Sequence, residues 1–488
     1  MPQVINTNVP SLNSQRNLDK TQGFMNTSLQ RLSSGLRINS AKDDAAGLAI
    51  SERFTAQIRG MDQARRNAND GISMAQTAEG ALSSSGDILQ RIRELAVQSA
   101  NATNSASDRT ALQQEASQLA SELDRIAQTT EFNGQKLLDG TNSSVYQVGA
   151  NAYQTITSTT TNFRTSAYGN YRIGASAAAT GDLTSGSTSN AIASSASATA
   201  RVVAGGVTIN GASGSANVAY AINDSAKTFA ANINAQTGTT GVTASARTEF
   251  DLTAFTANTS YTLSVTSNNT TAQSISFTVG GTVNGDGLSA AISAFNEQTS
   301  KTGITAKVNS TGTGVTLTND AGENIKVTVT SGTGGLTIGG SATASGATAN
   351  GTGQVTLDSD RSFNVVASET ASFFNTASSA AQLQKVNQVD VSTVAGANRT
   401  IAIVDGALQA TNGQRAKFGA LQSRFENTIA NLQASSENMS ASRSRIRDTD
   451  FANETANLTK AQILQQAGTA MLAQANALPN QVLSLLRG

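Results

Sequence analysis

Residues 461–486 contain no charged side chain, and this stretch constrains the fold more than any other part of the sequence. Small and apolar residues recur in it at alternating steps of four and three, the spacing of a coiled-coil seam. The seam consists of Leu464, Gly468, Met471, Ala475, Leu478, Val482 and Leu485, with a weaker row of Ile463, Ala467, Ala470 and Ala477. Because exposed coiled coils carry charges beside their seam, we expect this helix to be covered on several sides by copies of itself.

A membrane-spanning helix is the main alternative for an uncharged stretch of this length. Gln and Asn occupy positions 462, 465, 466, 474, 476, 480 and 481, and so many amide side chains would be costly in lipid. We therefore expect no membrane insertion. Pro479 lies inside the seam and predicts a kink or an early end of the helix there.

The N-terminal region contains a second seam. Its members are Leu18, Gln22, Met25, Leu29, Leu32 and Leu36, and Gly35 marks a helix end. Two terminal helices that each need a partner are expected to pair with each other. On the two helices we predict that polymerisation depends on Leu29, Leu32, Leu464, Met471, Leu472, Leu478, Val482 and Leu485.

The composition excludes several functions. Lys and Arg number 33 and Asp and Glu also 33, so no net charge attracts nucleic acid. The absence of Cys and His removes disulfides, thiol chemistry, the usual general base and the commonest transition-metal ligand. We expect no catalytic residues, no cofactor and no metal. The first ten residues have neither the basic start nor the apolar run of a signal peptide, which by itself predicts a cytoplasmic protein.

Long helical patterns fill the first and last fifths of the chain. Residues 40–43 have the spacing of a capping box, and we interpret Asp43 and Asp44 as first-turn acids rather than catalytic carboxylates. This helix is expected to continue to about residue 100. Ser105 and Asp108 restart a helix after a break, and one heptad register predicts another long helix over residues 404–446.

The sequence becomes strand-like after the first helices. Residues 131–137 predict a hairpin about Asn133-Gly134, and residues 145–156 predict further extended chain. About residues 165–385 are rich in Ser, Thr, Ala, Gly and Asn, a composition that also suits disorder. Short alternating strands within this region argue for folded structure instead.

An internal repeat supports this interpretation of the middle region. Residues 231–244 and 293–306 share a short helix followed by a strand, so we predict one or two small α+β modules. Residues 285–290 satisfy the short form of a dinucleotide fingerprint. The following strand lacks the acid that such a site needs, and we interpret the segment as a glycine turn.

These motifs together resemble those of bacterial flagellin. The segments that carry the resemblance are LQRLSSGLRINSAKDDAAG at 29–47, RNANDGIS at 66–73, QTAEGAL at 76–82, QQAG at 465–468 and LSLLR at 483–487. The resemblance implies a structural subunit that self-assembles into the helical filament used for motility, with its termini in the filament core. It also implies an extracellular location, reached through the flagellar secretion channel without a cleaved signal peptide.

The fold implied by the resemblance is mainly α, elongated and multidomain. Residues 1–40 and 450–488 would form a discontinuous inner coiled-coil domain, and residues 41–165 and 386–449 a helical rod with a β-hairpin. Residues 166–385 would form exposed, β-rich outer domains that contain insert-like repeats. The implied partners are other copies of the chain, an export chaperone, and the cap and hook-junction proteins.

The segment around residue 91 has two interpretations. It is a rod-helix face with Ile88, Ile92 and Leu95 packed inward, or it also contacts a partner. The resemblance implies recognition by a vertebrate Toll-like receptor in this region, with Arg91 and Leu95 as the main anchors. The predicted receptor contacts are Gln90, Arg91, Glu94, Leu95 and Glu115.

Other function classes remain open at this point. A hook–filament junction protein would have similar ends but would cap a filament rather than extend it. An adhesin-like module would use the Ser/Thr-rich middle region. An enzyme is disfavoured, because no nucleophile stands at a recognisable spacing from a base.

Overall fold

A computed structural model describes residues 7–141, 143–174, 202, 204–332, 336–338, 341–343, 346, 348–368, 373–374 and 378–486. The chain divides into two compact units. The first comprises Met1–Gln76, Ser143–Thr159 and Gly419–Gly488, and the second Thr77–Asn142 and Thr160–Phe418. The predicted domain boundaries at residues 40, 165, 385 and 450 stay a prediction.

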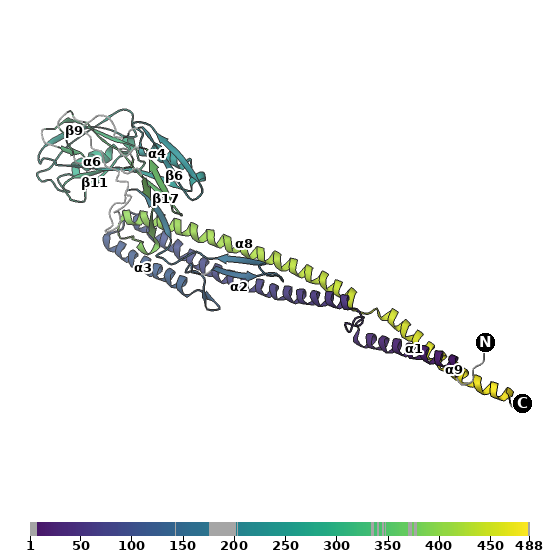
Figure 1. Cartoon of the computed structure of the whole chain (residues 1–488). Helices are drawn as coiled ribbons and strands as arrows, with labels where there is room; N and C mark the ends of the chain where they lie inside the picture. Colours follow the sequence, from purple (N-terminus) through teal and green to yellow (C-terminus); the bar gives the residue numbers. More distant parts are fainter. Residues whose placement is uncertain are drawn as a thin grey trace. The chain divides into compact units, whose positions relative to one another are not determined.

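The first unit is built from helices and one hairpin. Its elements are α1 (Val9–Ser34), the first part of α2 (Ala45–Ala100), β3 (Ser143–Gln147), β4 (Thr155–Thr159), the last part of α8 (Val394–Arg447) and α9 (Phe451–Leu486). Helices α1 and α9 lie side by side (Figure 1). The paired strands β3 and β4 pack on the long helices through a core of Ala68, Val148, Ile156 and Phe425.

Local caps set the helix ends in this unit. Gly35 adopts a left-handed φ of 70°, and its N–H donates to Arg31 O at 2.9 Å, so the predicted end of α1 is confirmed. The predicted start of α2 was too early, because Asp43 accepts hydrogen bonds within a turn that precedes the helix. Asp44 is the acid that receives Gly47 N–H, at 2.8 Å. Helix α9 continues past Pro479, so of the two predicted outcomes the early end was wrong, and the kink stays a prediction.

Gly71 shows why a helix interior here contains a glycine. The ring of the fully buried Phe425 lies against its backbone, and a Cβ at this position would stand 2.6 Å from Phe425 Cζ. The same ring meets Tyr146 edge-on, with ring centroids 5.6 Å apart. Glycine has a lower helix propensity than alanine, but at this position only glycine leaves room for α8 to approach closely.

The second unit begins with the helices around α3 (Ala106–Thr129). Ser105 and Asp108 form the predicted capping box. The Asn133-Gly134 turn joins β1 (Glu131–Phe132) to β2 (Gln135–Lys136) with positive φ at both residues, which confirms the hairpin. Buried residues on its long helices include Leu82, Leu89, Ile92, Leu95, Ala116, Leu123, Val404 and Phe418.

The rest of the second unit is rich in strands. The elements up to residue 302 are β5 (Gly169–Ile173), β6 (Gly205–Asn210), β7 (Ser215–Tyr220), α4 (Ala226–Asn234), α5 (Thr237–Thr240), β8 (Thr243–Thr253), β9 (Ser260–Thr266), β10 (Gln273–Thr278), α6 (Ser289–Glu297) and α7 (Thr299–Thr302). Then follow β11 (Thr305–Val308), β12 (Val315–Asn319), β13 (Ile325–Ser331), β14 (Leu336–Ile338), β15 (Ser341–Thr343), β16 (Thr348–Gly351), β17 (Gln354–Ser359), β18 (Asn364–Ala367), β19 (Ser378–Ala380), β20 (Gln382–Lys385) and η1 (Val386–Gln388).

Three sheets organise these strands. An eight-stranded sheet runs β11-β12-β8-β17-β5-β20, with β14 and β15 attached beside β8. Two four-stranded sheets have the orders β10-β9-β13-β16 and β19-β18-β6-β7. Helix α4 packs against β8, and α6 packs against β10 and β11; Figure 1 shows α4 and α6 within this strand-rich part. The predicted fold class, helical terminal regions with an inserted strand-rich middle, is confirmed.

Every strand pair within the described residues is antiparallel. A dinucleotide fingerprint belongs to a parallel βαβ unit. Residues 285–290 instead lie in the turn between β10 and the start of α6. None of the described helices is both long enough and apolar enough to cross a membrane.

Candidate assembly surface

Helices α1 and α9 contact each other through rows that mix small, polar and larger apolar residues. The least exposed positions of α9 recur at steps of four and three: Glu454, Leu458, Ala461, Gln465, Gly468, Leu472 and Ala475. The corresponding row on α1 is Ser11, Ser14, Leu18, Thr21, Met25, Ser28 and Leu32. A Cβ on Gly468 would stand 3.3 Å from Leu18 Cδ1, so the helices are in close contact there. We call these two rows the inner seam.

The inner seam contains Leu18, Met25, Leu32, Gly468 and Ala475 of the seams predicted from the sequence and corrects the rest. Leu464 and Met471 are 49% and 62% exposed, and Leu29 is 48% exposed, so the partner helix does not enclose these three side chains. Leu32 and Leu472 are half-buried within the inner seam. Helix α9 is apolar on more than one side, and its periodicity alone does not say which side meets α1. The side chains of Leu478, Val482 and Leu485 lie outside the described residues.

Polar contacts fix the antiparallel register of the pair. The Ser28 hydroxyl donates to Glu454 Oε1 at 2.6 Å, and Arg31 Nη1 stands 3.7 Å from Glu454 Oε2. At the other end, Asn8 Nδ2 donates to Ala475 O at 2.8 Å. Glu454 is only 6% exposed, so a carboxylate is enclosed between two helices with a hydroxyl and a guanidinium as its partners. One polar group inside a helical seam can specify register in this way.

Replacing Glu454 with Ala should destabilise the α1–α9 pair by about 1–3 kcal/mol, because the buried Ser28 hydroxyl loses its acceptor. Glu437→Ala, at an exposed position of α8, is the matched control and should have little effect. Amide hydrogen exchange along α1 measures the difference. Equal protection of α1 in both variants would contradict a role for Glu454 in holding the pair.

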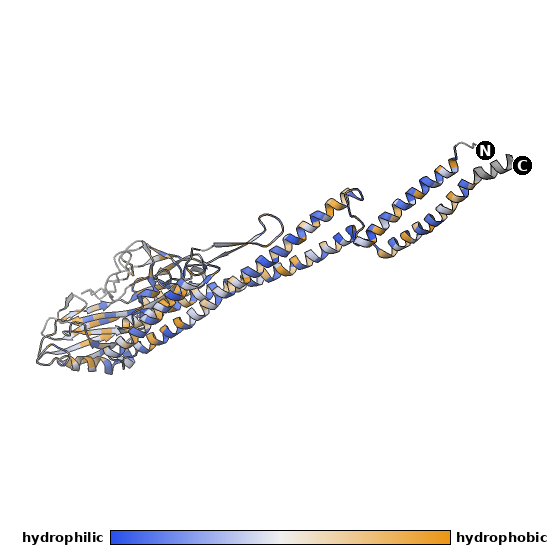
Figure 2. Cartoon of the chain, turned by 90° about the horizontal axis from the view of Figure 1, so that it is seen from below, coloured by the Kyte–Doolittle hydropathy of each residue, from blue (hydrophilic) through white to orange (hydrophobic). Residues whose placement is uncertain are grey.

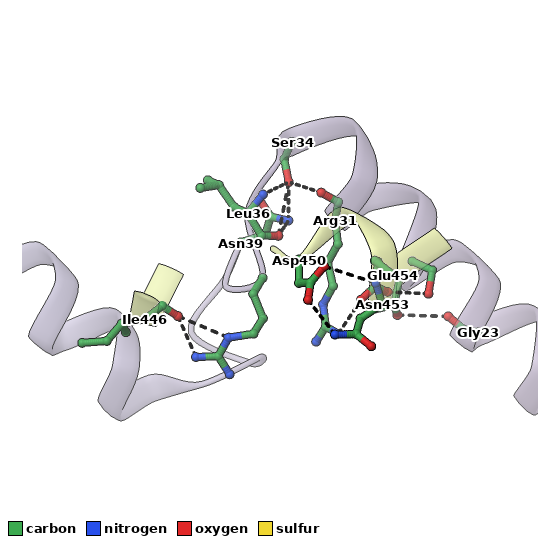
Figure 3. Close-up of polar contacts among 12 residues, drawn as sticks. Gly23, Arg31, Ser34, Leu36, Asn39, Ile446, Asp450, Asn453 and Glu454 are labelled. Carbon is green, nitrogen blue, oxygen red and sulfur yellow. Dashed lines mark hydrogen bonds and ion pairs between the residues drawn. The ribbon is translucent and has the colours of Figure 1, made fainter. Parts of the chain in front are cut away.

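Figure 3 shows the polar contacts where the chain enters and leaves the terminal pair. The guanidinium of Arg37 donates to Ile446 O from Nη2 at 2.6 Å and from Nε at 3.2 Å. Arg37 N–H donates to Arg447 O, and Thr449 N–H donates to Gly35 O. The two connecting segments therefore lie antiparallel, and Arg37 satisfies a carbonyl that the end of α8 leaves without a helical partner.

Asp450 caps α9 next to these contacts. Hydrogen bonds from the backbone and side chain of Asn453, and then from Ala452 N–H, hold the pKa of Asp450 below its usual range. The carboxyl is therefore ionised at neutral pH, in the form that best accepts the free N–H groups of a helix start.

Large apolar side chains remain exposed on α1 and α9. They are Val9, Leu12, Phe24, Leu29, Phe451, Ile463, Leu464 and Met471. Figure 2 shows apolar segments interspersed with hydrophilic ones along both helices. On α9, Ile463, Leu464, Ala467, Ala470 and Met471 are all exposed and form what we call the outer row. Contiguous exposed apolar side chains are typical of sites of association.

A groove of about 420 Å³ separates parts of the two helices and exposes some of these residues. Its lining consists of Thr21, Phe24, Thr27, Ser28, Arg31, Glu454, Asn457, Lys460, Ala461 and Leu464. The sequence prediction had not included Phe24, Phe451, Val9 or Leu12 as functional residues. Their signal was a large apolar side chain at a position outside either heptad row.

Four of the five predicted receptor contacts form an exposed polar cluster. Arg91 Nη1 stands 3.0 Å from Glu94 Oε2, and Arg91 Nη2 stands 2.8 Å from Glu115 Oε1. The hydrogen bonds that Arg91 donates to Glu94 and Glu115 raise the pKa of Arg91 above its ordinary value. Gln90 is exposed beside them. Leu95 differs, because it is 1% exposed in the core and is not available as a surface anchor.

The loop between β3 and β4 presents a second exposed feature of the first unit. Tyr153 is 96% exposed at a positive φ of 65°, an uncommon combination for an aromatic residue. It lines an open cleft of about 820 Å³ between this loop and α8. Within the described residues, no cluster of three or more His, Cys, Asp or Glu side chains is arranged to hold a metal ion.

The sequence of this chain matches family models and several known proteins. Residues 5–143 match the family model of the bacterial flagellin N-terminal helical region, and residues 401–486 that of the C-terminal helical region. The B-type flagellin of Pseudomonas aeruginosa is 46% identical over 100% of both chains, and Flagellin A of Vibrio anguillarum is 38% identical over 99% of both. The structure of FliC from Burkholderia pseudomallei is 21% identical, with a TM-score of 0.30, over 72% of this chain and 99% of that one. The chain therefore belongs to the bacterial flagellin family.

Proposed function

We propose that this flagellin assembles into the flagellar filament by burying the exposed apolar side chains of α1 and α9 against other copies. The observation that carries the proposal is the outer row of α9, which has no charged member and faces solvent in the single chain. A soluble helix that exists alone would place polar residues on that face. Of the predicted polymerisation residues, Leu29, Leu464 and Met471 are exposed in the single chain.

The energetics of repeated association support this arrangement. Fully burying a Leu, Ile, Phe or Met side chain is worth about 1.5–3 kcal/mol. Side chains that are already half exposed in one copy gain part of that amount when the next copy covers them. Because two different faces of α1 and α9 are involved, contacts of this kind extend into a helical polymer rather than close into a dimer.

The inner seam supports export as an unfolded chain. Half of its members are Ser, Thr, Ala or Gly, which bury little apolar area, so the helix pair gains further stability when other copies cover it. Passage through the secretion channel, without a cleaved signal peptide, and handling by an export chaperone are consistent with such termini. The mature protein is an extracellular filament component, and the cap and hook-junction proteins are its proposed neighbours.

A second proposal concerns recognition by a Toll-like receptor of the host. The exposed cluster of Gln90, Arg91, Glu94 and Glu115 supports it, since Arg is enriched at the centres of protein interfaces. The two carboxylates hold the guanidinium in place, so the receptor would meet a largely ordered surface. Leu95 would support Arg91 from below rather than contact the receptor.

Electron microscopy of the purified protein after ammonium sulfate precipitation tests the filament proposal. Growth should continue onto short seeds of the same protein and give tubes whose length increases with added monomer. A hook-junction protein would stop growth after a short cap. Globular particles under every condition would overturn the proposal.

A further inference from the structure

We infer that residues 248–353 are a second copy of a small module of strands and helices that the flanking residues 205–247 and 354–380 form, and that this second copy is inserted into a hairpin of the first. We infer also that a whole module can be added or removed at the end of this hairpin without unfolding the first copy. The first copy, which we call the host module, comprises β6, β7, α4, α5, the first half of β8, β17, β18 and β19. The second copy, which we call the inserted module, comprises the second half of β8, β9, β10, α6, α7, β11, β12, β13 and β16. The inference concerns the described residues within these limits.

The first argument is a set of hydrogen bonds that recurs 62 residues further along the chain. Asn234 Oδ1 accepts from Ala244 N–H at 2.7 Å, and its Nδ2 donates to Ala244 O at 2.8 Å. Asn296 makes the same two bonds with Ala306, at 2.8 and 3.1 Å. In each module the asparagine side chain therefore joins the helix to the strand that follows by two hydrogen bonds.

The turn between helix and strand repeats in the same detail. Thr237 Oγ1 donates to Val242 O at 2.9 Å, and Thr299 Oγ1 donates to Ile304 O at 2.7 Å. Each turn also ends in a glycine with a left-handed φ, 73° in the host module and 69° in the inserted one. Only glycine adopts this conformation freely, so both copies need it at the same place.

Strand pairing provides the second argument. The host sheet has the order β19-β18-β6-β7, and the inserted sheet has the order β16-β13-β9-β10. In both, a hairpin precedes the two short helices, and a later strand pairs antiparallel with the first strand of that hairpin. The two chain segments therefore have one topology, although the repeat seen in the sequence covers only the helix and the next strand.

Strand β8 belongs to both copies. Its residues 243–247 pair with β17 of the host, and its residues 248–252 pair with β12 of the insert. In the host module, β17 lies between the first half of β8 and β5. In the inserted module, the equivalent strand β12 lies between β11 and the second half of β8, so the second half of β8 takes the place that β5 has in the host. One long strand thus ends the first half of the host and begins the insert.

The two copies have separate cores. Ala244 and Ala246 pack on the cluster that contains Phe229, whereas Phe250 and Leu252 belong to the cluster that contains Phe295. The division falls inside β8, at the point where its partner changes. Ion pairs such as Lys227 with Glu323 and Arg247 with Asp320 join the copies at the surface.

The position of the insert follows from one pair of hairpins. In the inserted module, β11 and β12 are joined by residues 309–314, and Val308 pairs with Val315. The equivalent hairpin of the host ends at the pair Arg247 and Gln354. Where one copy has a six-residue loop, the other holds the whole second module.

Excision tests the inference in the full-length chain. Residues 248–353 are replaced by Asn-Ser-Thr-Gly-Thr-Gly, the loop that closes the β11–β12 hairpin. We expect scanning calorimetry of the monomer to lose one transition and to keep that of the host module, and seeded filament growth to continue. Loss of the host transition, or protease cleavage within β6 to β8, would overturn the inference.

A pair of core substitutions in the intact chain avoids any effect of the new junction. Phe295→Ala should lower the melting temperature of the inserted module alone, and Phe229→Ala that of the host module, because both rings are fully buried in different cores. A single transition shifted by both substitutions would show one cooperative domain and overturn the nested arrangement. These melts use the monomer, so their outcome does not depend on filament assembly.

Discussion

Replacing Leu464 or Met471 with Asp should abolish polymerisation and leave the monomer folded. Both side chains are exposed in the single chain, so the new carboxylate stays in water there. The proposed contact between copies covers the outer row in the filament, and burial of an unpaired charge there would cost several kcal/mol in every copy. Sedimentation after seeding measures assembly, and far-UV circular dichroism checks that helical content is unchanged.

Thr469→Asp is the matched control, because this residue is exposed on α9 but lies outside the outer row. It should polymerise at nearly the rate of the parent chain. If all three variants fail to assemble, any charge on α9 blocks growth and the outer row has no special role. If Leu464→Asp and Met471→Asp assemble normally, the apolar face of α9 is not buried between copies.

The second large effect is expected at the ring that joins the long helices to the β3–β4 hairpin. Phe425→Ala should destabilise the first unit by about 3–5 kcal/mol, because it removes a fully buried ring that packs against Gly71 and Tyr146. The cavity cannot collapse easily, since the helix backbone at Gly71 forms one of its walls. Chemical denaturation followed by circular dichroism measures the loss.

Phe451→Ala removes the same side chain from a position that is more than half exposed. Its free energy of unfolding should change by no more than about 0.5 kcal/mol. A similar loss in both variants would mean that the ring itself, and not its place in the core, determines the stability. The comparison also separates folding from assembly, because Phe451 belongs to the exposed apolar set of the terminal pair.

Local signals were the part of the fold that the sequence predicted well. Ser105 with Asp108, Gly35 and Asn133-Gly134 each specify a backbone conformation through their own side chain or its absence, and the structure has all three. The start of α2 was misplaced because two adjacent acids can both accept backbone N–H groups. Only the surrounding turn decides that Asp44 caps the helix.

The inner seam could be predicted only in part, because the pattern of α9 allows more than one contacting face. Gly468 and Ala475 were predicted correctly, but Leu464 and Met471 are exposed, and α1 meets the neighbouring positions of the row around Gly468 instead. The nesting of the two modules was also invisible. It depends on the pairing of Arg247 with Gln354, and pairings between residues so far apart in sequence leave no periodic signal.

The antiparallel link between residues 35–37 and 447–449 has a mechanical consequence. Its hydrogen bonds join backbone to backbone, and Arg37 adds a third tie to the last turn of α8. A torque applied to the terminal pair is therefore passed to both long helices at once, through peptide groups rather than through side chains that can slip. A rotating shaft built from such subunits would twist as a unit at this joint.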